Sequence, residues 1–256
     1  ETAYADDPNG SDSGAVFIYP GSASGILSSS TVTINGSNSD DQYGYWGRMD
    51  GGDFDCDGYA DLAIGSPNYD GVASNAGKVS IHYGTVSGYM NSSAGLTLYG
   101  GPADDQFGYQ VAVGDYNGDG CDDLAVSAPY EDTNNTNSGT VYFYYGSSSG
   151  LTSTVSNRQY GSSYNDYHGE RMVNPGDING DGYDDFVASG RFIFGDANGI
   201  VGGADQTWSD TDYYPMGDAT GEGYDDIVYT TTFYSGAADG TLVYEQNDSY
   251  LLTATD

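Results

Sequence analysis

The sequence has very few basic residues. Five Lys and Arg stand against 38 Asp and Glu in 256 residues, which gives a formal net charge of −33. Proteins that bind nucleic acid neutralise phosphates with clustered Lys and Arg, so this composition excludes that class of function. An anionic membrane surface is disfavoured for the same reason. The chain also lacks an apolar run near the roughly 18 residues that a membrane span needs, so we expect none.

Histidine is also scarce, with only His82 and His168 in the chain. A Ser-His-Asp triad would need one of them beside an activated serine, and the sequence has no G-x-S-x-G motif between a strand and a helix. We therefore expect both histidines to be structural. The sequence predicts no catalytic residues, and we expect the protein not to be an enzyme.

The residues that are abundant indicate a folded all-β protein. A charge this far from zero is common in disordered chains, but 37% hydrophobic residues, including 26 Tyr, supply enough apolar surface for a core. Gly, Ser, Asn and Asp separate short runs rich in Val, Ile, Tyr and Phe, which is typical of strands joined by turns. Three such runs share one outline, at 14–21, 77–84 and 139–146. No segment keeps a helical period over three turns, so we expect few helices.

An acidic loop recurs four times along the chain. It reads DFDCDGYAD from Asp53, DYNGDGCDD from Asp115, DINGDGYDD from Asp177 and DATGEGYDD from Asp218, with spacings of 62, 62 and 41 residues. Repetition at such a period indicates stacked units that cannot bury their hydrophobic faces alone. Each full unit contains an aromatic-Gly pair and four short strands around its loop, which predicts one β-propeller blade per unit.

The repeats predict a single β-propeller domain or segment over residues 1–256, with about 4.5 units. The predicted parts are a half-blade at 1–36, repeats at about 42–100, 106–161, 167–208 and 212–247, and a C-terminal strand at 248–256 that completes a split blade. Two hypotheses follow for the ends. They pair with each other in a fifth blade, or the chain is part of a larger propeller whose neighbours complete the split blade.

The loop pattern D-x-[DN]-x-[DN]-G-x-x-D predicts a calcium site. It places oxygen donors at positions 1, 3, 5 and 9, a backbone carbonyl at position 7, and a glycine at position 6 for the sharp turn. The predicted ligands are Asp53, Asp55, Asp57, the carbonyl of Tyr59 and Asp61 in the first loop; Asp115, Asn117, Asp119, the carbonyl of Cys121 and Asp123 in the second; Asp177, Asn179, Asp181, the carbonyl of Tyr183 and Asp185 in the third; and Asp218, Thr220, Glu222, the carbonyl of Tyr224 and Asp226 in the fourth.

The four loops are not equally good calcium sites. Thr220 and Glu222 replace shorter acidic or amide side chains in the fourth, so we expect Ca²⁺ in three loops and leave the fourth open. An EF-hand would need a Glu at position 12, where these loops carry Ile64, Val126 or Ala188. For one loop alone, an Asx-rich turn that bonds to its own backbone is the alternative. Three near-ideal copies favour calcium, because the clustered carboxylates would repel one another without a cation.

The motifs around the loops resemble FG-GAP repeats. The motifs that carry the resemblance are Tyr43-Gly44 and Gly65-Ser66-Pro67 around the first loop, and Phe107-Gly108 and Ser127-Ala128-Pro129 around the second. Such repeats form the β-propeller of integrin alpha subunits and occur in many secreted microbial proteins. The resemblance implies calcium between the first two strands of each blade, and ligands or partner subunits on the faces of the propeller. The sequence departs from the pattern at Gly190, where Pro is expected, and in having fewer units than the usual seven.

Together these features predict an extracellular, calcium-stabilised β-propeller that acts as a non-catalytic adhesion, surface or fibre-forming module. We expect a protein or glycan partner, or further copies of the chain itself. The alternatives are a lectin-like propeller that binds glycans through tyrosines and Trp46 or Trp208, and a non-catalytic appendage of a secreted enzyme. Five N-x-[ST] sequons would carry glycans only in a host that glycosylates them. They lie at Asn9, Asn35, Asn91, Asn134 and Asn247.

Cys56 and Cys121 are the only cysteines, which excludes a disulfide framework and leaves one bridge or two free thiols. They occupy different positions of successive loops. Because we expect neighbouring blades to hold equivalent loops beyond disulfide reach, we expect the two thiols to be unpaired.

Overall fold

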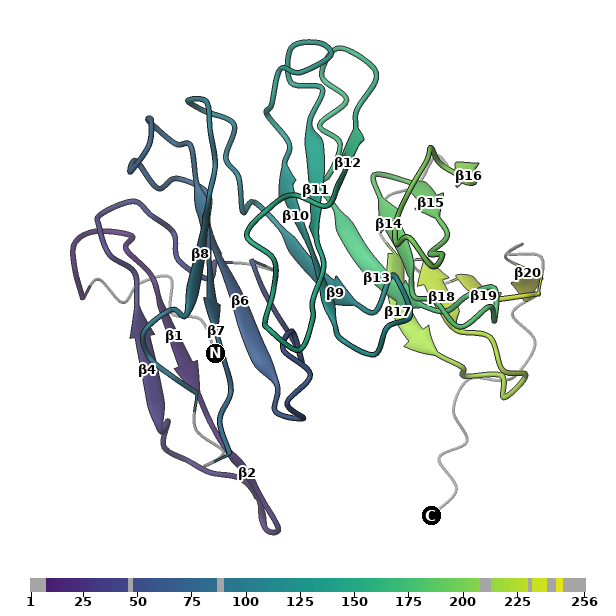
Figure 1. Cartoon of the computed structure of the whole chain (residues 1–256), viewed down its shortest axis with the longest axis horizontal. Coiled ribbons are helices and arrows are strands. Elements are labelled where there is room, and N and C mark those ends of the chain that lie inside the picture. The colour runs from purple at the N-terminus through teal and green to yellow at the C-terminus, as the bar shows by residue number, and fades with distance from the viewer. Residues whose placement is uncertain are drawn as a thin grey trace. The chain divides into compact units, whose positions relative to one another are not determined.

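The structure is a computed structural model that describes residues 8–45, 48–86, 90–207, 213–229, 232–238 and 243–245. It divides into two compact units, residues 1–115 with 119–172 and residues 116–118 with 173–256, and each is described by itself. All secondary structure in the described residues is β, and the paired strands are antiparallel within their sheets (Figure 1). The all-β fold and the four-stranded blades predicted from the sequence are confirmed.

The first unit contains two four-stranded sheets, each with its strands in chain order. One sheet consists of β5 (Met49–Gly52), β6 (Asp61–Ser66), β7 (Lys78–His82) and β8 (Leu96–Tyr99). The other consists of β9 (Val111–Gly114), β10 (Asp123–Ala128), β11 (Thr140–Tyr144) and β12 (Asn157–Tyr160). This simple order follows from short turns between consecutive strands, which is the topology of a propeller blade.

The N-terminal part of the first unit forms smaller sheets. The strand β1 (Ala15–Ile18) pairs with β4 (Val32–Asn35), and a hairpin of β2 (Gly21–Ser22) and β3 (Gly25–Ile26) lies between them in the chain. These strands lie within residues 1–36, and the half-blade expected there stays a prediction. Residues 1–7 and the predicted completing strand at 248–256 lie outside the described residues, so both hypotheses about the ends remain predictions.

The second unit contains the remaining two four-stranded sheets, again in chain order. One consists of β13 (Met172–Gly176), β14 (Asp185–Ala188), β15 (Arg191–Ile193) and β16 (Gln206–Thr207). The other consists of β17 (Tyr213–Gly217), β18 (Asp226–Tyr229), β19 (Thr232–Ser235) and β20 (Val243–Glu245). Its core cluster is Ile178, Val187, Phe192, Tyr213 and Ile227, smaller than the core of the first unit.

The aromatic-Gly pair has a clear structural role in the first unit. Phe107 is 3% exposed and its ring meets the edge of the Tyr142 ring at a centroid distance of 5.5 Å. Gly108 has a φ of +85°, and a Cβ there would lie 2.6 Å from the carbonyl oxygen of Lys78 on the neighbouring sheet. The pair therefore buries one ring while the chain passes too close to the next backbone for any side chain. The interface between these two sheets requires both residues.

Candidate metal centre

Each acidic loop connects the first two strands of a four-stranded sheet. In all four sheets, position 9 of the loop is the first residue of the second strand, at Asp61, Asp123, Asp185 and Asp226. The flanking strands agree with the sequence prediction and differ from the helices of an EF-hand. The loops are therefore repeated structurally as well as in sequence.

The first aspartate of each loop closes the turn around itself. The two carboxylate oxygens of Asp53 accept hydrogen bonds from the N–H of Asp57 (3.0 Å) and of Gly58 (2.9 Å). Asp115, Asp177 and Asp218 accept the equivalent pairs of bonds from positions 5 and 6 of their own loops. The glycine at position 6 has a φ of 85–93° in the four loops, the left-handed conformation that favours glycine. The fourth loop thus has the same backbone closure as the other three.

The aspartate at position 9 anchors the loop to the third strand of its sheet. One oxygen of Asp61 accepts the N–H of Phe54 (2.8 Å), and the other accepts the N–H of Gly84 (2.7 Å), just beyond β7. Asp185 and Asp226 make the same two kinds of contact, and Asp123 accepts the equivalent N–H of Gly146. The sequence analysis assigned these residues only as ligands. The glycine that ends each aromatic strand is the signal for this second role.

The first loop brings three carboxylates together. Ligand atoms of Asp53, Asp55 and Asp61 lie within 4.8 Å of one another, and among the described residues this is the one group of His, Cys, Asp or Glu with that proximity. Position 3 is an acid only in this loop; elsewhere it is Asn or Thr. Burial is the main cause that raises the pKa of Asp61 to about 6, and neighbouring Asp55 and Asp53 raise it further. The three carboxylates repel one another, and a divalent cation between them would remove this repulsion. Their oxygen atoms are the ligands that a hard cation such as Ca²⁺ prefers.

The other loops have Asn or Thr at position 3 and therefore fewer carboxylates among their predicted ligands. In the third, burial raises the pKa of Asp185 to about 8, and the charges of Asp177 and Asp181 add to this rise. In the fourth, the hydroxyl of Thr220 donates to the carboxylate of Glu222 at 2.8 Å, so these two substituted positions contact each other. Three residues of the second loop, 116–118, belong to the second unit, so the place of Asn117 in a site of this loop stays a prediction.

An aspartate at position 8 connects each of two loops to the loop before it, and the sequence analysis missed this role. Asp122 accepts the N–H of Asp53 at 2.7 Å, and its own N–H donates to the carbonyl of Asp53 at 3.0 Å. Asp225 makes the same pair of bonds with Asp177 in the second unit, both at 2.9 Å. The signal is the Asp-Asp doublet that ends the last three loops but not the first, where Ala60 stands at position 8.

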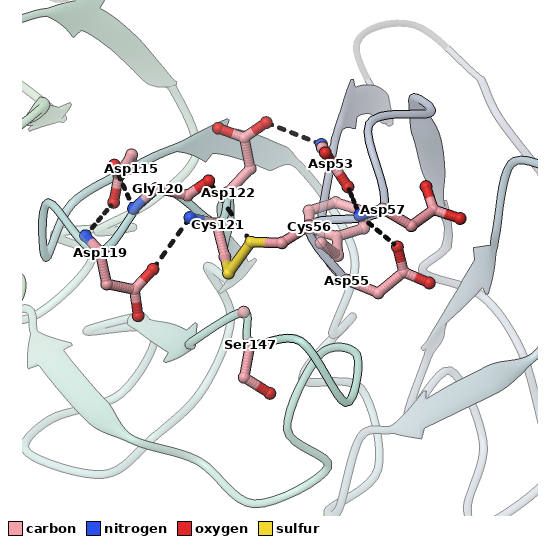
Figure 2. The surroundings of a disulfide bond; sticks show 12 residues. Asp53, Asp55, Cys56, Asp57, Asp115, Asp119, Gly120, Cys121, Asp122 and Ser147 are labelled. Carbon is pink, nitrogen blue, oxygen red and sulfur yellow. Dashed lines mark hydrogen bonds between the residues drawn. A yellow bond between two sulfur atoms is a disulfide. The ribbon is translucent and has the colours of Figure 1, made fainter.

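Cys56 and Cys121 form a disulfide between the first and second loops, with their Cα atoms 5.1 Å apart (Figure 2). The expectation of unpaired thiols is therefore wrong. It assumed that neighbouring blades hold their loops too far apart, but Cys56 at position 4 of its loop lies close to Cys121 at position 7 of the next. The two hydrogen bonds between Asp122 and Asp53 hold the two loops close together. The Cα atoms of the two cysteines then lie within the range of about 4.4–6.8 Å that is usual for disulfides.

The two histidines lie outside the loops and are buried. His82 has Nδ1 2.9 Å from the carbonyl oxygen of Asn91 and Nε2 2.8 Å from the hydroxyl of Tyr43. Because a carbonyl can only accept, Nδ1 carries the proton and Nε2 accepts from Tyr43. Burial lowers the pKa of His82, which keeps the ring neutral. His168 is 1% exposed. These contacts give His82 a structural role.

Two sequon side chains are also used by the fold. The amide nitrogen of Asn9 donates to the carbonyl of Gly36 at 2.7 Å, and that of Asn134 donates to the carbonyl of Gly161 at 2.9 Å. A glycan is attached through this same nitrogen. Glycosylation would replace one of the two hydrogens on this nitrogen, so the remaining N–H would have to be the one that donates to the carbonyl.

Comparison with known proteins identifies the repeats. The family described as FG-GAP repeat matches residues 45–82 and 107–144. Integrin alpha-4 of Xenopus laevis is 34% identical over 149 residues, which cover 55% of this chain and 14% of the integrin. Integrin alpha-PS2 of Drosophila melanogaster is 30% identical over 179 residues, 67% of this chain and 12% of the integrin. These matches confirm the resemblance inferred from the motifs.

An enzyme also shares the repeats. Phosphatidylinositol-glycan-specific phospholipase D of Bos taurus is 33% identical over 155 residues, 57% of this chain and 18% of the enzyme. The chain thus spans less than a fifth of the length of these relatives. Similarity alone does not decide between a catalytic and a non-catalytic protein, because the relatives include both integrin subunits and an enzyme. In the part of the chain that the structure describes, no helix has the length and apolar character to cross a membrane.

Proposed function

Because this chain is an FG-GAP repeat protein similar to integrin alpha subunits, we propose that it is an extracellular, calcium-stabilised β-propeller module without catalytic activity. Its role is adhesion, surface attachment or fibre formation through a protein or glycan partner or further copies of itself. The observation that carries the proposal is the proximity of Asp53, Asp55 and Asp61 within a loop whose closure recurs in all four sheets.

The residues that would hold calcium are the oxygen donors predicted from the loop pattern. Position 1 uses its oxygens to accept two backbone N–H groups, but each carboxylate oxygen has a further lone pair for a cation. The cation would neutralise the mutual repulsion within each loop. Four Ca²⁺ ions would change the formal net charge from −33 to −25. The fourth loop is the least suited, because Thr220 and the longer Glu222 replace the shorter acidic or amide side chains of the other loops.

An extracellular location is supported by two properties of the loops. The disulfide between Cys56 and Cys121 is of the kind that persists in oxidising compartments. Calcium sites of extracellular modules have dissociation constants of about 10⁻⁴ to 10⁻³ M, which suits loops with few ligands. A glycosylated asparagine is not required by the proposal.

The absence of catalysis is supported by the chemistry of the histidines. Both ring nitrogens of His82 are held by Tyr43 and Asn91, and His168 is buried, so neither offers a general base at the surface. An appendage of a secreted enzyme is the second candidate, favoured by the similarity to phosphatidylinositol-glycan-specific phospholipase D. The lectin-like alternative relied partly on Trp46 and Trp208, which lie outside the described residues.

Calorimetric titration of the chelator-treated chain with Ca²⁺, together with sedimentation, tests the proposal. We expect at least three bound ions per chain, and a Asp53→Asn, Asp55→Asn variant should lose one of them. The matched control is Asp70→Asn, an exposed acid outside the loops, which should leave the number of ions unchanged. Absence of calcium binding would refute the calcium proposal. Multimers formed only with Ca²⁺ would favour self-assembly, whereas a monomer would direct the search to a foreign partner.

A further inference from the structure

The first unit contains a cavity of about 400 Å³ that is separate from the acidic loops. Its lining residues are Tyr45, Arg48, Tyr109, Gln110, Glu170 and Arg171. Every one of them precedes the first strand of a sheet, β5, β9 or β13. The acidic loops follow the first strands, so the cavity lies toward their opposite ends. The metal sites therefore do not account for it.

Arg48 is the buried charge in this cavity, with only 7% of its surface exposed. Its guanidinium lies over two aromatic rings, 5.2 Å from the centroid of Tyr45 and 4.9 Å from that of Tyr109. Its Nε donates to the carbonyl of Tyr109 at 3.2 Å, and Nη1 donates to the side-chain oxygen of Gln42 at 2.7 Å. The rings and the two bonds fix the plane of the guanidinium before any ligand arrives.

The charge of Arg48 is not balanced by an acid in the described part of the chain. Its hydrogen bonds go to a carbonyl and an amide, and no carboxylate of the described residues pairs with it. Burying a cation without a counter-charge is costly, and stacking against tyrosines offsets only part of that cost. In a chain of net charge −33, an arginine left without an acidic partner is unexpected. An external anion would supply the missing charge.

A second cation lies at the exposed edge of the same cavity. Arg171 is exposed, as is Glu170 beside it. Two of the five Lys and Arg of the chain thus line one cavity, against a single acid. Two guanidinium groups match the geometry of a carboxylate, which accepts paired N–H donors. The tyrosines and Gln110 add aromatic surface and polar groups for the body of a ligand.

We infer that this cavity binds a small organic carboxylate, with Arg48 as the buried anchor and Arg171 closing over the anion from the edge. A volume of about 400 Å³ is within the lower part of the range for ligand sites, so the ligand is a single monosaccharide acid, hydroxy acid or amino acid, free or at the end of a longer chain. The site is independent of the proposed calcium function.

Nitrogen-15 NMR titration of the calcium-loaded chain tests this inference. The probes are glucuronate, N-acetylneuraminate, lactate and alanine, with glucose and N-acetylglucosamine as neutral controls. We expect at least one carboxylate to shift the Nε–H signals of Arg48 and Arg171, with a dissociation constant of about 1 mM or below. The neutral sugars should not shift them. The probe that binds most tightly identifies the class of ligand.

Variants separate binding from folding. Arg171→Met changes an exposed residue and should weaken binding about tenfold without altering the fold. Arg48→Met should abolish binding; if it also unfolds the chain, the Arg171→Met result decides alone. The matched control is Arg158→Met, because Arg158 also lies over a tyrosine ring, Tyr142, but not in the cavity. No carboxylate binding up to about 10 mM, equal binding of neutral sugars, or no effect of Arg171→Met would overturn the inference.

Discussion

The two units close their acidic loops in the same way but connect them differently. In both, an aspartate at position 8 bonds to the first residue of the preceding loop, through Asp122 in the first unit and Asp225 in the second. Only the first unit adds a disulfide, and its outer strands β8 and β12 have four residues where β16 has two. The comparison shows that each loop closes through contacts among its own residues. The contacts between two loops depend instead on how the sheets that carry them pack together.

Calcium removal should have the largest effect. If three sites with dissociation constants near 10⁻⁴ M are saturated at millimolar Ca²⁺, their loss costs about 5 kcal/mol in the free energy of unfolding. This corresponds to a fall of roughly 10–20 °C in Tm. Hydrogen exchange during chelation should show β17 and β18 losing protection before β6 and β10, because the first unit keeps its disulfide. Simultaneous loss in both units would contradict the comparison.

The Cys56→Ser, Cys121→Ser variant should have the next largest effect. The disulfide joins residues 65 apart, and closing a loop of that length contributes about 4 kcal/mol in the chain-entropy description. Denaturant unfolding should show this loss in the first unit, and a reductant should reproduce it in the unchanged chain. Hydrogen exchange in β14 and β18 serves as the internal control. An equal loss of protection there would mean that the bridge stabilises more than its own unit.

Removing an aspartate at position 8 should separate the two kinds of connection. Asp225→Ala leaves the N–H of Asp177 without its carboxylate acceptor and should cost about 2 kcal/mol. Asp122→Ala should cost about half as much, because the disulfide still holds the same loops together. In the cysteine-free background, Asp122→Ala should regain the full cost. Thermal melting of the unchanged chain, Asp122→Ala, the cysteine-free chain and their combination forms a double-mutant cycle, and additive effects would refute the shared role.

Restoring the fourth loop should bring a smaller gain. Thr220→Asn with Glu222→Asp shortens the side chain at position 5 and recreates the donors of the third loop. We expect about tenfold tighter calcium binding at this loop, or about 1.4 kcal/mol. Calorimetric titration measures it, and the same count of tight sites before and after the change would show that side-chain length is not what limits this loop.

Asp105 should give the smallest effect, and one that depends on pH. It is 6% exposed, and burial, followed by Glu131 and other nearby acids, raises its pKa to about 6. A folded pKa above the unfolded value means that the penalty is present above pH 6 and is relieved as the pH falls toward the unfolded pKa of about 3.9.

Asp105→Asn should therefore stabilise the first unit by about 1 kcal/mol at pH 7 and have little effect near pH 4. The matched control is Asp41→Asn at the equivalent place before the aromatic-Gly pair. The carboxylate of Asp41 accepts bonds from Ser37 and Asn38, so this change should destabilise the chain instead. Thermal melts at several pH values measure both variants. A pH-independent gain from Asp105→Asn would contradict the assignment of its pKa.

Much of the loop geometry could be predicted from the sequence. The aspartate at position 1 and the glycine at position 6 make their contacts inside one loop, so a short pattern contains all the information needed to place them. The strand runs at 77–84 and 139–146 likewise became β7 and β11, because alternating apolar and aromatic residues between glycines favour a buried strand. The strand expected at 248–256 lies outside the described residues and stays a prediction.

By itself, the sequence determined the all-β fold, the period of the repeats and the four oxygen-rich loops, because these follow from contacts between near neighbours in the chain. Tertiary structure decided which parts of different repeats meet: the disulfide from Cys56 to Cys121, the bonds of Asp122 and Asp225 to earlier loops, and the cavity around Arg48. The residues that meet in these contacts are dozens of positions apart in the sequence. The register in which one sheet packs on the next sets their distance, and a repeating pattern read one unit at a time does not contain that register.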